Sequence, residues 1–230
     1  MRPTAGGPEQ SSSPIQATLS YRPFNPKRLP TASSSGRTLL SERLIVLTGP
    51  SGVGKGTLLT CLRRRHKDLY VSVSSTTRTP RAGEVEGRDY YFVSPEEFER
   101  LIEAGALLEW AQYVGQYYGT PRAPVEARLA EGKPVVLEIE VQGAYQIKNN
   151  FPAAMLVFIA PPSFEVLAQR LRDRSTDDSA AIERRLTRAR EELESAREFD
   201  YRVVNEDLET AVQQIEQIIF REEPLDSTDR

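Results

Sequence analysis

The segment Gly49–Thr57 constrains the fold of this chain more than any other. Its first seven residues, Gly-Pro-Ser-Gly-Val-Gly-Lys, fit the pattern G-x-x-x-x-G-K. The apolar run Leu44–Leu47 precedes it and leucines at helical spacing follow it, so the motif lies between a strand and a helix. In that setting glycines turn backbone N–H groups toward one centre, and the helix N-terminus adds partial positive charge. We predict that the phosphates of a nucleoside triphosphate contact Gly49, Pro50, Ser51, Gly52, Val53, Gly54, Lys55, Gly56 and Thr57.

Two positions of this loop narrow the chemistry. Lys55 can reach the β and γ phosphates, and a plain glycine-rich turn, which is the alternative, would not need a lysine there. The position that usually holds a magnesium-binding hydroxyl is Gly56, and the hydroxyl follows at Thr57. Gly-Lys-Gly-Thr resembles the loops of nucleotide kinases such as adenylate and bacterial guanylate kinases, which implies ATP as the ligand. We expect that phosphates and water hold Mg²⁺, with no direct protein ligand, and that Thr57 bonds a phosphate oxygen.

The composition excludes several other kinds of site. Cys61 is the only cysteine and His66 the only histidine, so an intrachain disulfide is impossible, and a zinc site or a histidine-based triad is nearly excluded. The formal net charge of -3 provides no overall attraction for nucleic acid. No apolar run approaches the roughly 20 residues that span a bilayer. We expect a soluble protein whose chemistry uses phosphates, Mg²⁺, arginine and carboxylate.

From residue 44 onward strand signals alternate with helix signals. This alternation predicts the three-layer α/β fold of phosphate-loop NTPases, with a mainly parallel sheet and helices on both faces. The polar block at 75–122 interrupts it, so we expect a separate lobe there. Apolar runs and spacings of three and four predict strands at 44–47, 71–74, 135–137, 155–159 and 201–204, a pair of short strands within 107–118, and helices at 58–62, 95–104, 123–131, 163–171, 182–193 and 208–219.

The two ends of the chain differ from the rest. Residues 1–40 are rich in Ser, Pro, Thr and Gly and have no sustained apolar period, so we predict disorder. Their basic residues face a single acid, Glu9, and this resembles an organellar transit peptide. We prefer the alternative of a non-functional bacterial extension, or of a start codon placed too early, and therefore expect the cytoplasm rather than an organelle. The predicted organisation is completed by one domain at 41–222 and a frayed tail at 223–230.

A second polar segment offers an anion site. Arg78 and Arg81 lie in the block Ser74–Glu84, and their planar guanidinium groups suit a phosphate dianion. Tyr90 can add a hydroxyl donor. Taken without any family, the block predicts an anion site near the edge of a sheet, and a solvated charged loop is the alternative.

Here the chain resembles the guanylate kinase family, from about residue 43 to residue 220. The likeness rests on Gly-Pro-Ser-Gly-x-Gly-Lys, on Ser-Ser-Thr-Thr-Arg-x-Pro-Arg-x-Gly-Glu, on Glu-Trp-Ala at 109–111, on Tyr-Tyr-Gly-Thr at 117–120 and on Ile-Ala-Pro-Pro-Ser at 159–163. It implies an inserted α+β lobe at 74–122 that binds GMP, and a helical lid at about 163–195. It also implies that the GMP phosphate is held by Arg78, Arg81, Tyr90 and Tyr118, that guanine meets Ser74, Glu109 and Thr120, and that Glu84 holds an arginine of the site in place.

Carboxylates account for the base specificity that this resemblance implies. Guanine presents N1–H and N2–H₂ donors on one edge, which Glu109 can accept as a pair, whereas adenine would leave that carboxylate unpaired. A surface carboxylate at a helix end is the alternative. The strand at 135–137 ends in Glu138 and Glu140, which alternation places on the same face. Family members often carry aspartate there, so it stays open which of the two touches guanine, as we expect of Glu138, and which lies near the metal.

Phosphoryl transfer needs two aligned phosphates and cations where negative charge develops. Arg170 and Arg174 are four residues apart and share a helix face, and Arg185 follows on the next predicted helix. These positions match the lid arginines of the family, so with Lys55 they are the predicted catalytic residues. A solvated basic face is the alternative, and we prefer it for three other arginines: Arg184, Arg188 and Arg190.

Two more positions are compared with the family. Ser175 stands where the family usually has glycine, so the hinge of the lid is expected to differ. Asn205, in Val-Val-Asn at 203–205, matches the position that meets adenine.

Three functions are kept apart. The first is a catalytic guanylate kinase of purine nucleotide metabolism, a monomer or homodimer that phosphorylates GMP and dGMP. The second is a guanylate-kinase-like interaction module without turnover; such modules tend to lose the loop lysine and the lid arginines, which are present here. The third is another phosphate-loop ATPase or an adenylate-type kinase, against which the block 78–84 and Glu109 argue. We predict the first.

Overall fold

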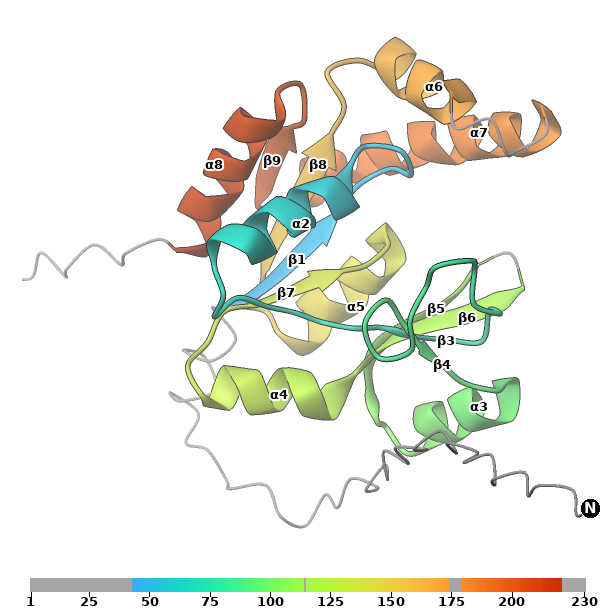
Figure 1. The fold of residues 1–230 in the computed structure, drawn as a ribbon, viewed down its shortest axis with the longest axis vertical. Coiled ribbons are helices and arrows are strands. Elements are labelled where there is room, and N and C mark those ends of the chain that lie inside the picture. The colour runs from blue at the N-terminus through green and yellow to red at the C-terminus, as the bar shows by residue number, and fades with distance from the viewer. Residues whose placement is uncertain (1–42, 114, 174–178, 221–230) are drawn as a thin grey trace, which may run out of the picture.

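A computed structural model describes residues 43–113, 115–173 and 179–220 (Figure 1). Within these residues five parallel strands form the central sheet, in the order β2-β7-β1-β8-β9. The strands are β1 Leu44–Thr48, β2 Tyr70–Val71, β7 Val135–Glu138, β8 Met155–Ala160 and β9 Tyr201–Val204. The predicted α/β fold with a parallel sheet is confirmed.

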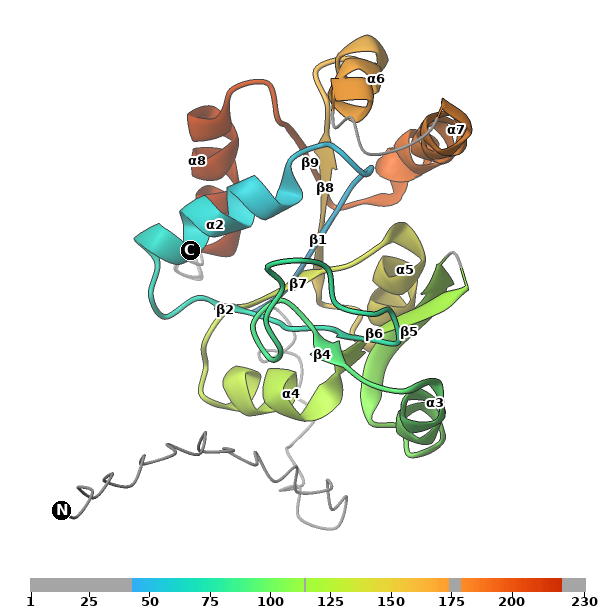
Figure 2. The same ribbon diagram turned by 45° about the vertical axis from the view of Figure 1, so that its right-hand side comes forward.

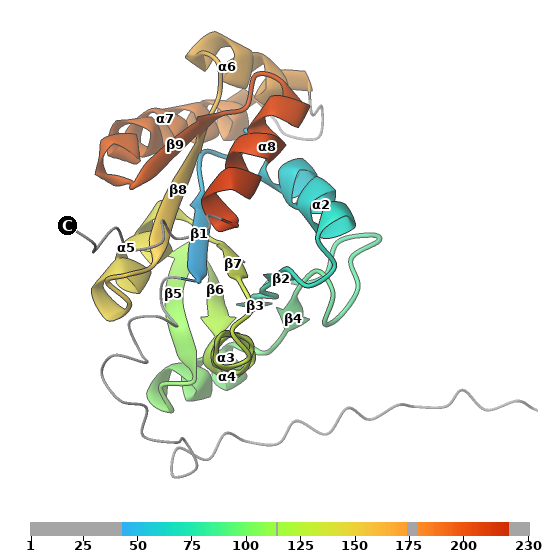
Figure 3. The same ribbon diagram turned by 90° about the vertical axis from the view of Figure 1, so that its left-hand side faces the viewer.

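Helices cover both faces of this sheet (Figure 2). Side chains of β1 alternate between the two faces: Ile45 and Leu47 pack with α2 and α8, and Leu44 and Val46 pack with α4 and α5. All four side chains are fully buried. Figure 3 shows the strands between α5 on one side and α2 with α8 on the other. The helices are α2 Lys55–Arg65, α4 Arg122–Ala130, α5 Val141–Asn150, α6 Phe164–Asp173, α7 Ser179–Ser195 and α8 Leu208–Ile219, with a short 3₁₀ helix, η2, at Ala196–Glu198.

A second sheet lies within the segment expected to form a lobe of its own. Its order is β4-β3-β6-β5, with antiparallel pairs on both sides of β6. The helix α3 (Pro95–Glu103) begins as the sequence predicts, because Ser94 accepts a hydrogen bond from the N–H of Glu97. Phe98 of this helix is fully buried and stacks on Tyr117 of the sheet. The strands are β3 Ser75–Thr76, β4 Tyr91–Phe92, β5 Leu107–Tyr113 and β6 Gln116–Pro121.

Two elements differ from the sequence-based prediction. The strand expected at 71–74 has only two residues, because the chain leaves the central sheet after Ser72 and joins the second sheet at Ser75. The helix α5 was not predicted. Its start has no side-chain cap and a glycine in its first turn, so the local signals are weak. It is held instead by packing, since Ala144 and Ile147 are fully buried against the sheet.

Several predictions fall on parts of the chain that the structure does not describe. The disorder expected at 1–40, the tail at 223–230, Arg174 and Ser175 lie outside the described residues. Among the described residues, no helix combines the length and the apolar character that a membrane crossing requires.

Candidate active site

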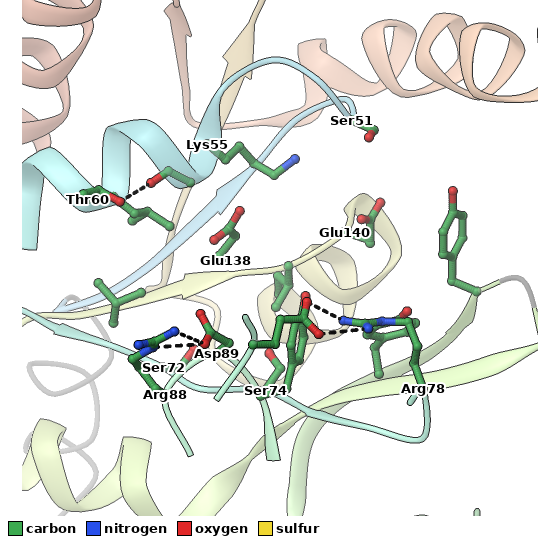
Figure 4. A pocket seen from close by; sticks show the side chains of 18 of the residues that line it. Ser51, Lys55, Thr60, Ser72, Ser74, Arg78, Arg88, Asp89, Glu138 and Glu140 are labelled. Atoms are coloured by element: carbon green, nitrogen blue, oxygen red, sulfur yellow. Dashed lines mark hydrogen bonds and ion pairs between the residues drawn. The ribbon is translucent and has the colours of Figure 1, made fainter. Parts of the chain in front are cut away.

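A cavity of about 710 Å³ lies between the phosphate loop and the second sheet. Figure 4 shows Ser51 and Lys55 on one side, Ser74 and Arg78 on the other, and Glu138 between them. Residues far apart in the sequence therefore meet around one space. The predicted site residues that line it are Ser51, Gly52, Gly54, Lys55, Gly56, Thr57, Ser74, Arg78, Arg81, Glu84, Tyr90, Glu109, Tyr118 and Glu138.

The phosphate loop joins the carboxyl end of β1 to the N-terminus of α2. Gly54 caps the helix with φ 100°, a left-handed conformation that favours glycine. Lys55 Nζ donates hydrogen bonds to the carbonyl oxygens of Gly49 and Pro50, at 2.5 and 3.5 Å. The lysine is therefore held across its own loop, with its ammonium group where the helix N-terminus adds positive charge.

Asn205 packs behind the loop and does not line the cavity. Its Nδ2 donates to the carbonyl oxygen of Val53 at 2.7 Å, and its side chain is buried. A Cβ atom on Gly54 would lie 2.6 Å from that Nδ2, so the missing side chain of Gly54 makes the approach possible. Arg170 adds hydrogen bonds to the carbonyl oxygens of Val53 and Asn205, at 3.5 and 3.3 Å. Both residues thus brace the loop; the contact of Asn205 with adenine stays a prediction.

The helix α7, in the segment predicted to form a lid, contacts the phosphate loop. Arg185 Nη2 donates to Ser51 Oγ at 2.7 Å. The expectation of a solvated face for Arg188 is wrong, because its guanidinium group pairs with Glu140 and Glu192. Arg184 and Arg190 are exposed, as expected, although Arg190 lies over the ring of Phe164.

Arg78 is held in a fixed orientation on the acceptor side. Its two terminal nitrogens donate to the two carboxylate oxygens of Glu84, at 3.0 and 2.9 Å. Glu84 also accepts the N–H of Arg81 at 2.7 Å, and its hydrogen bonds with Arg78 lower the pKa of its carboxyl. The Arg78 guanidinium lies 5.3 Å from the ring centre of Tyr90. The resemblance had implied that Glu84 holds an arginine of the site, and the structure shows this pairing.

Glu109 lies on β5 with only 4% of the residue exposed, so the alternative of a surface carboxylate is wrong. Its Oε1 accepts a hydrogen bond of 2.6 Å from Thr120, its partner on β6. Thr120 is fully buried and does not line the cavity. Burial raises the pKa of Glu109 to about 7. Hydrogen bonds from Thr120 act in the opposite direction and lower this pKa, while the charge of Glu140 raises it further.

The other oxygen of Glu109 lies against α5. A Cβ atom on Gly143 would overlap Oε2 of Glu109, so a larger residue at 143 would displace the carboxylate. The unpredicted helix α5 therefore contributes a glycine that gives Glu109 its place.

Glu138 and Glu140 both border the cavity, in different environments. The Glu138 side chain is exposed to the solvent that fills the cavity, but protein atoms lie close to it on most sides. This enclosure raises the pKa of its carboxyl, while the charges of Lys55 and Arg63 act in the opposite direction. Glu140 precedes the first turn of α5 and forms an ion pair with Arg188.

Several residues that line the cavity were missed by sequence reasoning. Arg63 follows Lys55 by two helical turns, so their shared helix face was an available signal. Arg88 and Asp89 directly precede Tyr90 in the sequence, but of these three residues only Tyr90 was predicted to belong to the site. Ser72, Thr60 and Tyr113 carried no distinguishing signal. Glu140 also lines the cavity; the sequence analysis had named it and left its role open between substrate and metal.

A phosphate loop, a group of arginines across the same cavity and a helix that places Arg185 on the loop together define a phosphotransferase of the phosphate-loop class. The family model described as guanylate kinase matches residues 41–222. The chain therefore belongs to the guanylate kinase family, as the resemblance predicted.

Individual relatives agree with this assignment. The chain is 63% identical over 197 residues to a guanylate kinase of Gloeobacter violaceus, covering 86% of this chain and 95% of the relative. It is 56% identical over 187 residues to a guanylate kinase of Synechocystis, covering 81% and 98%. The crystal structure of guanylate kinase from Anaplasma phagocytophilum is similar, with a TM-score of 0.62 and 37% identity, over 76% of this chain and 83% of that one.

Proposed function

We propose that this chain transfers the γ-phosphoryl group of ATP to GMP, and also to dGMP. The observation that carries the proposal is a cavity that opens to the phosphate loop on one side and to Arg78, Glu84 and Glu109 on the other. In the reaction, the bond from the γ-phosphorus to the β–γ bridging oxygen breaks, and a bond to a phosphate oxygen of GMP forms. The products are ADP and GDP.

On the donor side, the loop residues 49–57 bind the phosphates of ATP through backbone N–H groups. Lys55 exchanges its contacts with loop carbonyls for the β and γ phosphates, and Thr57 bonds a phosphate oxygen. Arg185 already contacts the loop at Ser51, so it lies where charge develops during transfer. Arg170 stabilises the same loop from behind, and Arg174, outside the described residues, is proposed to join them.

On the acceptor side, the GMP phosphate lies against a group of cationic and hydroxyl side chains. Since Arg78 is already oriented by Glu84, phosphate binding costs little side-chain ordering. Glu109 accepts the N1–H and N2–H₂ donors of guanine, and Thr120 orients that carboxylate. We assign these residues to the phosphate and the base only, and on that assignment extend the proposal to dGMP. Arg81, Tyr90 and Tyr118 complete the phosphate contacts, and Ser74 and Glu138 face the base.

The residues around the phosphate loop fit a hydrated Mg²⁺ ion. The hydroxyl of Thr57 and the carboxylates of Glu138 and Glu140 open onto the cavity, and oxygen is the ligand atom that Mg²⁺ prefers. Among the described residues, no cluster of three carboxylate, histidine or cysteine ligands is present. We propose that phosphates and water bind the ion directly, with these side chains around its water shell. When bound, Mg²⁺ shields the negative charge of the phosphates.

One assay tests the proposed reaction. ADP release is measured with ATP and Mg²⁺ in the presence of GMP, dGMP, AMP or no acceptor. We expect release with GMP and dGMP, and little with AMP or without acceptor, because adenine leaves Glu109 unpaired. Equal release without acceptor would indicate an ATPase. Binding of GMP without any ADP release would indicate the interaction module, against which Lys55, Arg170 and Arg185 argue.

The cellular location, the oligomeric state and the lack of a nucleic-acid partner stay predictions. We propose a cytoplasmic protein, because the relatives are bacterial-type enzymes and the described residues contain no membrane-spanning helix. Locating tagged copies with and without residues 1–40 tests the organellar alternative. A monomer or homodimer, and the absence of nucleic acid as a partner, are likewise predicted from the sequence.

A further inference from the structure

We propose that Arg188 is a positioning residue that fixes the lid helix α7 against both substrate-binding parts and thereby aims Arg185 at the phosphate loop. The inference rests on the proposed role of Arg185 in phosphoryl transfer. It assigns to Arg188 an action on the reaction without contact to substrate.

Three contacts from three parts of the fold converge on Arg188. Its Nε donates to Glu192 Oε1 at 2.8 Å, one turn further along α7. Its Nη2 donates to Glu140 Oε2 at 3.2 Å, at the junction of β7 and α5 in the core. Its guanidinium carbon lies 4.3 Å from the ring centre of Tyr113, at the end of β5 in the second sheet. One planar group thus connects the lid, the core and the acceptor lobe.

The burial of these partners distinguishes this arrangement from a surface ion pair. The side chain of Glu192 is only 9% exposed, and a buried carboxylate is costly without a cationic partner. The pair with Glu140 is half-exposed and by itself would add little. Two carboxylates and a ring around one guanidinium nevertheless fix the plane of that group, because hydrogen bonds and stacking act in different directions.

The same helix face carries the arginine that meets the loop. Arg185 and Arg188 are three residues apart on α7, so their side chains leave the helix on neighbouring positions of one face. Arg185 contacts Ser51, and Arg188 contacts the opposite border of the cavity at Glu140 and Tyr113. A rotation or shift of α7 would move both contacts together. Arg188 therefore sets the place from which Arg185 reaches the reacting phosphates.

The test is a double-mutant cycle on turnover with saturating ATP and GMP. We expect Arg188→Ala to lower kcat about tenfold with the KM values changed less than about threefold, because a misplaced Arg185 loses contacts made in the transition state. In an Arg185→Ala background, Arg188→Ala should lower kcat by less than about twofold, since its effect acts through Arg185. Arg184→Ala is the matched control, an exposed arginine of the same helix, and should leave kcat unchanged.

Removing Arg188 alone leaves the buried carboxylate of Glu192 without its cationic partner, and this could unfold the protein. A second variant therefore separates an effect on turnover from an effect on folding. Arg188→Ala with Glu192→Gln removes that charge and should show the same loss of kcat with a normal unfolding midpoint. The inference is overturned if kcat of this double variant stays within twofold of the wild-type value. It is also overturned if the fold-losses in kcat of Arg185→Ala and Arg188→Ala multiply when the two changes are combined. If Arg185→Ala itself leaves kcat unchanged, the proposed role of Arg185 fails, which is a separate result.

Discussion

The phosphate loop and the acceptor site face each other across one cavity, but they are built from different parts of the chain. The loop is a single segment, 49–57, and we propose that it binds phosphate mostly through its backbone N–H groups. The acceptor site consists of side chains from β5, β6 and the loop between β3 and β4, held in pairs such as Arg78 with Glu84 and Glu109 with Thr120. Recognition of phosphate can thus be local, whereas recognition of a base needs tertiary pairing.

The difference has a physical cause. A triphosphate is recognised by charge and by oxygen lone pairs, which a turn and a helix N-terminus satisfy without a particular partner elsewhere. Guanine is distinguished from adenine by two donors on one edge, so a carboxylate has to be buried and oriented for them. Buried Glu109 therefore depends on both Thr120 across the hairpin and Gly143 on α5.

The largest effect is expected on the loop side. Lys55→Ala should lower kcat by about a thousandfold, because a preorganised cation at the transferring phosphoryl group is removed. Steady-state kinetics with both substrates varied would measure it. Lys67→Ala, an exposed lysine beyond the end of α2, is the control. Near-normal turnover of Lys55→Ala would contradict the donor site as proposed.

On the acceptor side, Arg78→Met should lower kcat/KM for GMP by about a hundredfold or more. The change removes a charge-assisted phosphate contact and leaves Glu84 without its paired cation, for a loss of about 3 kcal/mol. The KM for ATP should stay within about threefold. An equal rise in both KM values would show that the two sides are not separate in the way proposed.

Glu109→Gln should lower kcat/KM for GMP by about thirtyfold. Glutamine keeps one acceptor for guanine but replaces the second with a donor, so one hydrogen bond to a charged group, worth about 2 kcal/mol, is lost. Comparing GMP with AMP in the assay described above measures the change in base preference. Unchanged preference would remove Glu109 from the guanine site.

The pH dependence sharpens this assignment. Since burial raises the pKa of Glu109 to about 7, and guanine needs the ionised form, the KM for GMP should rise as the pH falls below about 7 and be flat above it. Glu109→Gln should abolish this dependence. The folded-state pKa is above that of the unfolded chain, so the contribution of Glu109 to stability is lost as the pH rises to 7. Glu109→Gln should therefore raise the unfolding temperature more at pH 8 than at pH 5.

The smallest effect is expected from Gly143→Ala. The added methyl group displaces the Glu109 carboxylate and should raise the KM for GMP about tenfold, as overpacking by one methyl costs about 1–3 kcal/mol. The shorter side chain in Gly143→Ala with Glu109→Asp should restore part of the loss. Gln142→Ala, an exposed neighbour on α5, should have no effect. Failure of the double variant to improve on Gly143→Ala would locate the damage elsewhere in α5.

The sequence by itself determined the class of fold and the position of the phosphate loop. Both follow from local chemistry: apolar runs predict buried strands, and G-x-x-x-x-G-K between strand and helix has few other uses. The resemblance to a known family also supplied the predicted acceptor residues, most of which line the cavity. Local patterns failed at α5, whose uncapped start is stabilised by burial of Ala144 and Ile147.

Only the tertiary structure decided which charged residues are paired and which are free to meet water. Arg184 and Arg188 look alike in the sequence, yet Arg184 is exposed while Arg188 meets Glu140, Glu192 and Tyr113 from three separate segments. The meaning of a charged side chain depends on its desolvation and on its neighbours, and both are set by long-range packing. For the same reason, the raised pKa of Glu109 and its dependence on Gly143 became visible only in the folded molecule.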